Sequence, residues 1–460
     1  MYQIDFKNPV HMHFIGIGGI SMSGLAEVLL GAGFTVSGSD AKASALTGSL
    51  EKKGARVMIG QCAENITPDI DCVVYTAAIR SDNPEFEAAV RAELPMLTRA
   101  QLLGEIMRNY DMPIAVSGTH GKTTTTSMCS HILMHGGFDP TISVGGILPS
   151  IGGNIRVGNS ETFITEACEY TNSFLSFFPK IELILNVDSD HLDFFKDLDD
   201  IANSFHRFAE LLPKDGTLII NRDSEKFDTV TNGISCEIIT YSMMETADYT
   251  AENIMMDGRG CGSFVCMEKG KPIGSFSLKV PGLHNVSNAL AAIALGRKLG
   301  LDAETIAEGL SAFSGTERRF EYKGMLNGAV IIDDYAHHPT EIKATLKAAQ
   351  NYPHKELYVA FQPHTYTRTK ALLPEFAEAL SLADHVILAD IYAAREKNTI
   401  GISSDDVRAL LENSGSDAVY LPSFTEIESY LKERLKEGDL LITMGAGNIV
   451  DVGEHLLHEE

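Results

Sequence analysis

The sequence has little positive charge and no long apolar run. Its 460 residues include 37 Lys and Arg against 62 Asp and Glu, so the formal net charge is −25. With this charge and no basic run, we do not expect a polyanion such as DNA or RNA as a partner. No stretch approaches the roughly 18 consecutive apolar residues of a transmembrane helix, so we expect no membrane insertion.

The chain also lacks the marks of an exported or zinc-binding protein. Residues 1–7 have no signal-peptide layout. The seven cysteines are scattered, and Cys261 and Cys266 have no second pair to complete a zinc site. We therefore expect free thiols in a reducing cytoplasm. We also expect the protein to be a monomer or a weak homodimer.

The length and composition are typical of a multidomain globular protein. For 460 residues the length prior is about three domains, and 44% apolar with 22% charged residues is ordinary. The chain alternates predicted strands and helices in three α/β blocks, with limits expected at 1–110, 111–315 and 316–460. Within the second block, residues 215–280 predict short strands joined by Gly and Asp turns.

The most informative motif is a glycine loop between a predicted strand and a predicted helix. An apolar run from Pro113 leads into Gly118-Thr-His-Gly-Lys-Thr123, and a helical period follows. Such a loop points backbone N–H groups at one spot, where a phosphate binds with help from the helix dipole. Lys122 would contact the β- and γ-phosphates, and the Thr123 hydroxyl would ligate Mg²⁺. Because Val116 stands where the usual pattern has its first glycine, the loop is compact. We predict that the chain splits a nucleoside triphosphate.

Two acidic clusters follow later strands of the same block. Glu166 and Glu169 lie at the end of one strand, and Asp190, His191 and Asp193 follow another. Alone, an acidic pair at a strand end is more often a solvated turn or a helix cap. Because parallel strands present functional residues at their carboxyl ends, where the glycine loop also lies, we expect both clusters to converge on a metal. Carboxylates with one imidazole suit Mg²⁺ or Mn²⁺.

The first block opens with a glycine turn that resembles a dinucleotide fingerprint but is defective. The first two glycines fit G-x-G-x-x-G, whereas the third position is Ser21. The loop can still hold a diphosphate on backbone amides, with Asp40 near a ribose. A strand over residues 71–78 ends in Thr76 and Ala77, which either line the same crevice or simply pack there.

Polar side chains also mark the end of the second block and the third block. Asn285 and Asn288 lie three apart on one helical face, where their amides suit an adenine edge or only a helix cap. In the third block, a group of polar side chains follows predicted strand ends, which favours a substrate-facing role. The group consists of Asp333, Tyr335, His337, His338, His364 and Arg368.

As an ordered set, these motifs resemble those of the Mur ligases of peptidoglycan synthesis, from about residue 13 to 447. The shared motifs are G-T-H-G-K-T-T, E-A-C-E-Y…S-F-L, N-V-D-S-D-H-L-D, H-N-V-S-N-A-L-A-A, E-R-R-F-E and D-D-Y-A-H-H-P-T-E. Within the family, G-I-G-G-I-S-M-S-G-L-A and F-Q-P-H-T-Y-T-R-T are most similar to the branch that joins L-alanine to UDP-N-acetylmuramate.

The resemblance implies an α/β fold of three domains and an ATP-driven amide ligase. A Rossmann-like N-terminal domain would bind the UDP-sugar, a P-loop ATPase central domain with a parallel sheet and a β-rich insertion would bind ATP, and a Rossmann-like C-terminal domain would bind the amino acid. The lactyl carboxylate would attack the γ-phosphate to form an acyl phosphate, which the amine of L-alanine would then attack. Charge builds on phosphoryl oxygens in both steps, so Lys122 and Mg²⁺ would supply most of the stabilisation.

The resemblance also assigns roles by motif match. The catalytic residues would be Lys122, Glu169, His191 and His337, and the metal ligands Thr123, Glu169 and His191. ATP would contact Gly118, Thr119, His120, Gly121, Lys122, Thr123, Thr124, His284, Asn285, Asn288, Arg319 and Asp333. The UDP-sugar would contact Gly18, Gly19, Ser21, Asp40 and Thr76, and the amino acid Tyr335, His337, His364 and Arg368.

Two departures from the family pattern limit this transfer. Sibling ligases carry a carbamylated lysine after the D-H pair, where this chain has Phe205 and His206. Some relatives have a second arginine near Thr365, whereas this segment has Arg368 alone. The group that binds the alanine carboxylate therefore stays open. The alternatives are a recycling ligase that joins a ready-made tripeptide to the same UDP-sugar, and a non-enzymatic nucleotide-dependent regulator.

Overall fold

The structure is a computed structural model that describes residues 2–76, 78–191, 194–394 and 396–458. The chain separates into two compact units, residues 1–187 with 202–239 and residues 188–201 with 240–460. Ala77 and Asp193, both candidates from the sequence, lie outside the described residues. No described helix combines the length and apolar character needed to cross a membrane.

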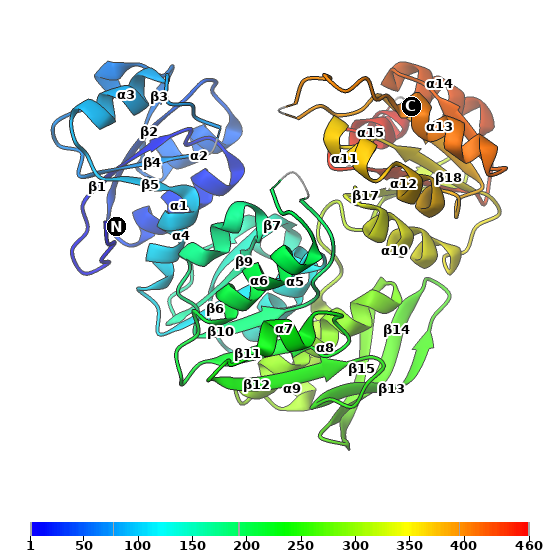
Figure 1. Ribbon diagram of the computed structural model, residues 1–460, viewed down its shortest axis with the longest axis horizontal. Helices are drawn as coiled ribbons and strands as arrows, with labels where there is room; N and C mark the ends of the chain where they lie inside the picture. Colours follow the sequence, from blue (N-terminus) through cyan, green and yellow to red (C-terminus); the bar gives the residue numbers. More distant parts are fainter. Residues whose placement is uncertain (1, 77, 192–193, 395, 459–460) are drawn as a thin grey trace. The chain divides into compact units, whose positions relative to one another are not determined.

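The first unit begins with a parallel sheet of five strands in the order β3-β2-β1-β4-β5. Its strands are β1 (His11–Ile15), β2 (Thr35–Asp40), β3 (Arg56–Ile59), β4 (Cys72–Tyr75) and β5 (Met96–Thr98). Its helices are α1 (Ile20–Gly31), α2 (Ala45–Lys52), α3 (Pro84–Arg91) and α4 (Arg99–Met107), with a 3₁₀ turn at Ala63–Asn65 (Figure 1). Because the strand order reverses between β1 and β4, their loops meet at the carboxyl edge, where such folds bind ligands.

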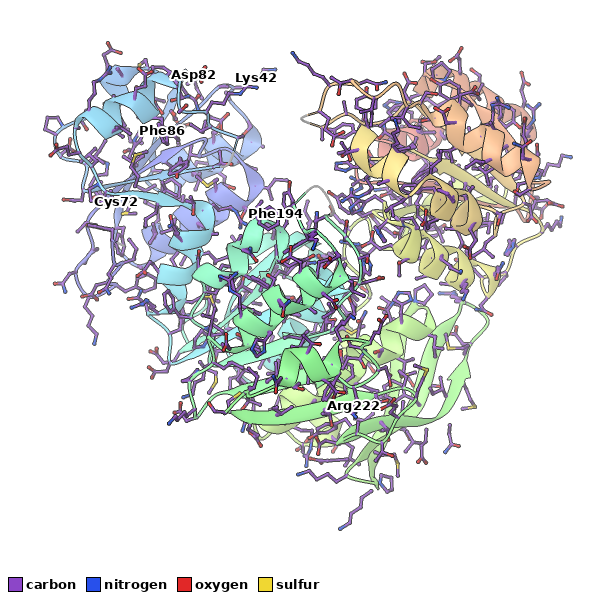
Figure 2. The ribbon with its side chains drawn as sticks, viewed as in Figure 1. Lys42, Cys72, Asp82, Phe86, Phe194 and Arg222 are labelled. Atoms are coloured by element: carbon purple, nitrogen blue, oxygen red, sulfur yellow. The ribbon has the colours of Figure 1, made fainter. Side chains whose placement is uncertain are left out.

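Close packing at this edge explains the first glycine of the turn. Gly16 has a φ of +87°, and a Cβ there would lie 2.9 Å from the Thr76 Cγ2 atom. Tyr75 of β4 meets Phe86 of α3 edge to face, with ring centroids 5.2 Å apart. Phe86 is labelled in Figure 2. The loops after β1 and β4 thus pack closely against each other, and the core beside them fixes the end of β4.

The second sheet of this unit places β6 between β9 and β10, in the order β11-β10-β6-β9-β7-β8. The strands are β6 (Met112–Ser117), β7 (Thr141–Leu148), β8 (Gly153–Arg156), β9 (Thr162–Ala167), β10 (Ile181–Ile184) and β11 (Thr217–Asn221). The helices are α5 (Lys122–His135), α6 (Leu198–Ala209), which begins in the other unit, and α7 (Phe227–Thr231), with 3₁₀ turns at Pro149–Ile151 and Tyr170–Ser176. Ser117 pairs with Ala167 on one side and Ile184 on the other, so three strands deliver their ends to one edge.

Glu182 of β10 is a buried carboxyl group inside this sheet. Its side chain is fully buried, and neither oxygen has a hydrogen-bond partner among the described residues. Burial raises its pKa well above the ordinary value of 4.5. A carboxyl whose pKa rises on folding contributes stability that is complete only below its unfolded pKa and is lost as the pH rises through its folded pKa.

We therefore expect Glu182→Met to stabilise the protein by about 1–3 kcal/mol at pH 7.5, because the substitution removes an unsatisfied buried polar group. The gain should shrink as the pH falls toward and below the ordinary pKa of 4.5, because the carboxyl of the unfolded wild type then becomes protonated as well. Urea unfolding at pH 7.5 and pH 5 measures both effects, with the exposed Glu161→Met as control. A gain that is absent, or equal at both pH values, would contradict this account.

The second unit contains a β meander and a further sheet. The meander consists of the antiparallel strands β13 (Tyr249–Met256), β14 (Cys261–Glu268) and β15 (Lys271–Pro281), followed by α8 (Leu283–Lys298) and α9 (Ala303–Ala312). β12 (Glu237–Ser242), whose start lies in the first unit, pairs with β13 in parallel. The sheet has the order β16-β17-β21-β18-β19-β20, with β16 antiparallel to β17 and the other pairs parallel. Its strands are β16 (Glu321–Leu326), β17 (Ala329–Asp334), β18 (Leu357–Phe361), β19 (His385–Leu388), β20 (Asp417–Tyr420) and β21 (Leu440–Met444).

Helices cover both faces of this sheet. They are α10 (Pro339–Gln350), α11 (Tyr366–Ala371), α12 (Leu373–Leu380), α13 (Ser404–Asn413), α14 (Phe424–Arg434) and α15 (Val450–His458). Val359 and Phe361 of β18 join one buried cluster, whereas Tyr358 and Ala360 join the other. Alternate residues thus serve two cores, each apolar side chain contributing about 1.5–3 kcal/mol. The expected α/β class with parallel sheets is confirmed.

Candidate functional site

The glycine loop of the first unit connects β6 to α5. Gly121 caps α5 in the left-handed region, with a φ of 84°, and contributes no side chain to the cap. Gly118 has a φ of +142°, and a Cβ there would lie 2.9 Å from the Leu185 Cβ atom. The first backbone N–H groups of a helix have no carbonyl partner within it. The loop therefore has the backbone geometry that binds a phosphate.

Asn186, just beyond β10, holds the loop from the neighbouring strand. Its carbonyl oxygen accepts the Thr119 N–H at 3.2 Å, and its Oδ1 accepts the His120 N–H at 2.8 Å. Its amide nitrogen donates to the His120 carbonyl at 3.0 Å. The sequence prediction missed this residue, although it stands at a strand end directly before the second acidic cluster.

Lys122 lies at the loop with its charge balanced by Glu169. The Lys122 Nζ atom is 3.0 Å from the Glu169 Oε2 atom and donates to the carbonyls of Gly118 and Thr119 at 2.5 and 3.0 Å. The Glu169 side chain is 2% exposed. Burial alone would lower the pKa of Lys122, but the facing carboxylate of Glu169 outweighs it and raises the pKa. Lys122 is therefore a cation at neutral pH, fixed where a phosphate would bind.

Side-chain oxygen atoms that could ligate a metal lie around the start of α5. The Thr123 hydroxyl donates to the Glu166 Oε2 atom at 3.1 Å, and the Gly145 N–H donates to the other oxygen of Glu166. Glu166 and Glu169 come from the end of β9, so the structure brings both carboxylates to the loop as predicted from the strand ends. The described residues contain no group of three or more His, Cys, Asp or Glu side chains that could hold a metal. A hydroxyl with two carboxylates nevertheless fits Mg²⁺, which keeps several waters and binds substrate phosphates.

Thr124 lies one residue further along the first turn of α5. His191 belongs to the second unit, whereas Lys122 and Glu169 belong to the first. The convergence of His191 on the metal, and its catalytic role, therefore stay predictions.

The glycine turn of the first sheet is braced by the end of β2. The N–H groups of Gly16 and Ile17 both donate to the Ser39 carbonyl at 2.9 Å. The Gly18 N–H donates to the Asp40 Oδ2 atom at 2.9 Å. Asp40, expected near a ribose, thus fixes the turn, and the Gly18 N–H is taken.

The first turn of α1 offers the remaining amides of this loop. Gly19 caps α1, which begins at Ile20, without a side chain. Ser21 in that turn accepts a hydrogen bond on its hydroxyl oxygen from the Arg99 Nη1 atom at 3.1 Å. Thr76 lies at the same edge, after β4. Arg99 escaped the sequence prediction, because the short strand β5 before it was not predicted; in the structure Arg99 directly follows that strand.

The two asparagines of α8 lie together, as their spacing predicts. The Asn285 amide donates to the Pro281 carbonyl at 2.7 Å, and the Asn288 amide donates to the Asn285 Oδ1 atom at 3.0 Å. Each is 7% exposed. Their role toward adenine stays a prediction.

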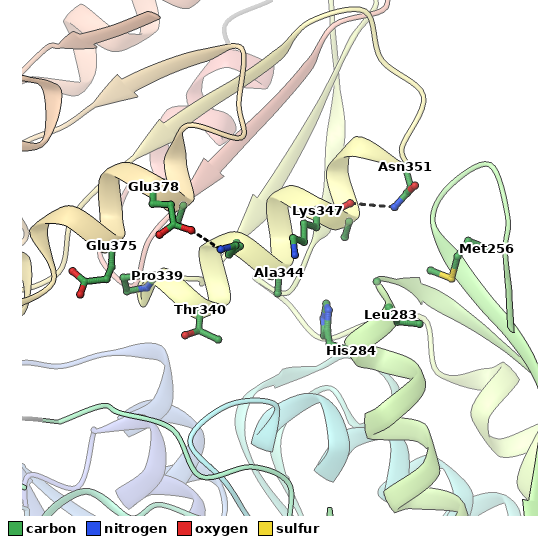
Figure 3. Close-up of a pocket in the computed structure, with 14 residues that line it drawn as sticks. Met256, Leu283, His284, Pro339, Thr340, Ala344, Lys347, Asn351, Glu375 and Glu378 are labelled. Atoms are coloured by element: carbon green, nitrogen blue, oxygen red, sulfur yellow. Dashed lines mark hydrogen bonds and ion pairs between the residues drawn. The ribbon is translucent and has the colours of Figure 1, made fainter. Parts of the chain in front are cut away.

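His284 lines a pocket of about 660 Å³ in the second unit. Figure 3 shows His284 of α8 below Lys347 of α10, with Glu378 of α12 to the left in the view. Lys343 donates to the Glu378 Oε1 atom at 2.7 Å. The pocket therefore presents an imidazole and a paired lysine to a ligand of nucleoside size.

The four residues predicted to surround the amino acid form one cluster in the second unit. The His337 ring centroid is 5.5 Å from those of both Tyr335 and His364. The Arg368 Nη1 atom is 3.1 Å from the His364 Nδ1 atom. Burial lowers the pKa of His337 and of His364 to about 4, although the Glu341 carboxylate opposes the shift at His337. At neutral pH the cluster therefore combines uncharged imidazoles with the Arg368 cation.

Asp190, expected near the metal, contacts this cluster. Its Oδ1 atom is 3.3 Å from the Arg368 Nη2 atom, and the two side chains are 10% and 13% exposed. Burial would raise the pKa of Asp190, but nearby His191 and Arg368 outweigh it and hold the value at about 2. Arg368 thus faces a carboxylate in the structure, which is the chemistry expected of an amino-acid subsite.

The neighbouring arginines Arg318 and Arg319 have different partners. Asp333 is fully buried and pairs with the Nε atom of Arg318 at 3.1 Å, while the Thr443 hydroxyl donates to it at 2.7 Å. Arg319 lies over the Tyr335 ring at 5.2 Å. A contact of Asp333 with nucleotide would therefore act through Arg318, which the sequence prediction did not single out.

A phosphate loop between β6 and α5, with carboxylates delivered by β9, defines a P-loop nucleotide-binding protein. Three family models match the chain in order: "Mur ligase family, catalytic domain" over residues 11–111, "Mur ligase middle domain" over 116–296, and "Mur ligase, glutamate ligase domain" over 318–447. The chain is 61% identical over 457 residues to a protein of Agathobacter rectalis named UDP-N-acetylmuramate–L-alanine ligase, covering 99% of this chain and 100% of that one.

Solved structures agree with this similarity. A UDP-N-acetylmuramate–alanine ligase of Thermotoga maritima matches with a TM-score of 0.81 at 30% identity, covering 97% of this chain and 98% of the other. A murein peptide ligase of Psychrobacter arcticus matches with a TM-score of 0.71 at 27% identity and the same coverage. The chain belongs to the Mur ligase family.

Proposed function

We propose that this protein is a cytoplasmic ATP-dependent ligase that joins L-alanine to the lactyl carboxylate of UDP-N-acetylmuramate in peptidoglycan precursor synthesis. The observation that carries the chemistry is the buried Lys122–Glu169 pair at the phosphate loop. The similarity over almost the whole chain to proteins named for this reaction supports the substrates. Residues 1–110 would bind the UDP-sugar, 111–315 ATP and 316–460 the amino acid.

In the first step, the lactyl carboxylate attacks the γ-phosphate of ATP, releasing ADP and forming an acyl phosphate. Lys122 and the first amides of α5 hold the phosphoryl oxygens, where charge spreads in the transition state. Thr123, Glu166 and Glu169, with His191 as predicted, would hold Mg²⁺ or Mn²⁺, which neutralises phosphate charge when bound. The His284 end of the pocket, with Asn285 and Asn288, receives adenine.

In the second step, the amine of L-alanine attacks the acyl carbon and phosphate leaves. Arg368 binds the alanine carboxylate in place of Asp190, since guanidinium and carboxylate pair with good geometry. His337 stays neutral and accepts a hydrogen bond from the amino group, which aims the amine. Tyr335 and His364 complete the walls of this subsite.

Phosphate release distinguishes this function from the tripeptide ligase and from a non-enzymatic regulator. The protein is incubated with ATP, Mg²⁺ and UDP-N-acetylmuramate, together with L-alanine, the tripeptide or no amine. We expect phosphate and a product one alanine residue heavier with L-alanine only. Release with the tripeptide instead would favour the recycling ligase, and no release with any amine would contradict a ligase of either kind.

A further inference from the structure

Arg99 lies at the same sheet edge as the glycine turn. It is the first residue of α4 and directly follows β5, whose last residue Thr98 pairs with Tyr75 of β4. The loop after β4 in turn contacts the turn after β1, since Gly16 packs against Thr76. Arg99 therefore belongs to the crevice at the point where the strand order reverses.

The guanidinium of Arg99 has little to stabilise it there. Its hydrogen bond to the Ser21 hydroxyl is the one bond it makes within the described part of the chain, and no carboxylate of that part lies within ion-pair distance. Burial lowers its pKa. It also begins a helix whose first turn holds no acidic residue, and a cation is unfavourable at that end of the helix dipole. Arg99 is half-buried, and a partly desolvated cation without a counter-ion costs stability unless an anion binds it.

The position and donors of Arg99 match a diphosphate. Ser21, its partner, lies in the first turn of α1, where helix amides attract phosphate oxygens. Because the Gly18 N–H is already bonded to Asp40, the glycine turn has one amide fewer for this task. A guanidinium supplies several donors in a planar fork that grips phosphate, and the chain as a whole carries a net charge of −25, which makes a local cation necessary.

We propose that Arg99 binds the diphosphate of the UDP-sugar, together with the first turn of α1. The assignment rests on the proposed function, because it takes UDP-N-acetylmuramate as the ligand. The diphosphate takes no part in the bond changes, so Arg99 contributes ground-state binding. Its loss therefore raises the KM for the UDP-sugar and leaves kcat and the KM values for ATP and L-alanine nearly unchanged.

The test compares Arg99→Gln, Arg99→Lys and the control Arg91→Gln, whose arginine is 66% exposed on α3. We expect Arg99→Gln to raise the KM for UDP-N-acetylmuramate by about 10- to 100-fold, the range for a hydrogen bond to a charged group. The inhibition constant of UDP, which has the diphosphate and no lactyl carboxylate, should rise by the same factor. Arg99→Lys should keep part of the affinity, and Arg91→Gln all of it.

Each other outcome overturns the assignment. An unchanged KM in Arg99→Gln, or a wild type that millimolar UDP does not inhibit, means that Arg99 does not bind the diphosphate. A raised KM with an unchanged UDP inhibition constant assigns Arg99 to the lactyl carboxylate. An equal rise in all three KM values, with a lowered unfolding temperature that Arg99→Lys restores, makes Arg99 a link between α1 and α4. If the wild type itself does not use UDP-N-acetylmuramate, the proposed function fails.

Discussion

Lys122→Met is expected to lower kcat by at least about 10²–10³-fold, the effect of removing one preorganised donor from developing charge. Lys122 is the cation that the fold fixes at the phosphate loop, through Glu169 and the carbonyls of Gly118 and Thr119. Its contact with the γ-phosphate strengthens as charge moves onto the phosphoryl oxygens, so kcat should fall more than the KM for ATP rises. Phosphate release under saturating substrates measures the effect.

The control for Lys122→Met is the exposed Lys214→Met, which should leave turnover unchanged. Removing Lys122 also takes away the cation that faces the buried carboxylate of Glu169, which destabilises the loop. The double variant Lys122→Met/Glu169→Gln relieves that charge, so its unfolding temperature should return toward the wild-type value while its turnover stays low. Full turnover in either variant would contradict the assignment of the phosphate loop.

Strand ends made much of the site predictable from the sequence. Apolar runs that stop at polar residues identify carboxyl edges, and those edges are shared by neighbouring parallel strands. That rule correctly brought Glu166 and Glu169 to the loop of Lys122. In the second unit it brought His337 and Arg368 into one cluster.

The choice of partner within an edge was not predictable, because it depends on side-chain reach and on which atoms are already bonded. Asp333 pairs with Arg318 and not with its neighbour Arg319. Asp40 takes the Gly18 N–H. Glu182 lies in a strand that the apolar pattern marks as buried, but no pattern indicates that its carboxyl has no hydrogen-bond partner in the described part of the chain. These pairings depend on the three-dimensional arrangement of the side chains, which the sequence pattern does not contain.

Arg368→Met is expected to lower kcat/KM for L-alanine by at least about 30-fold, since truncating one partner of a buried charge pair costs about 2 kcal/mol or more. The guanidinium is 13% exposed and lies beside neutral His364, so no imidazole charge replaces it at neutral pH. The KM values for ATP and UDP-N-acetylmuramate should change little. The exposed Lys370→Met, two residues further along α11, is the matched control.

Trapping the acyl phosphate with hydroxylamine separates the two chemical steps. If Arg368 serves only the amino acid, Arg368→Met forms the hydroxamate of UDP-N-acetylmuramate from ATP at the wild-type rate in the absence of L-alanine. Loss of the hydroxamate as well would place Arg368 in the first step, where its contact with Asp190 beside His191 would connect it to the metal. A normal KM for L-alanine would instead assign the alanine carboxylate to Arg318 or Arg319, which both lie over the Tyr335 ring. Arg318 is the nearer, with its Cζ atom 4.9 Å from the ring centroid. Because neutral His337 and His364 carry no charge to pair with a carboxylate, we expect one of these arginines to bind the alanine carboxylate.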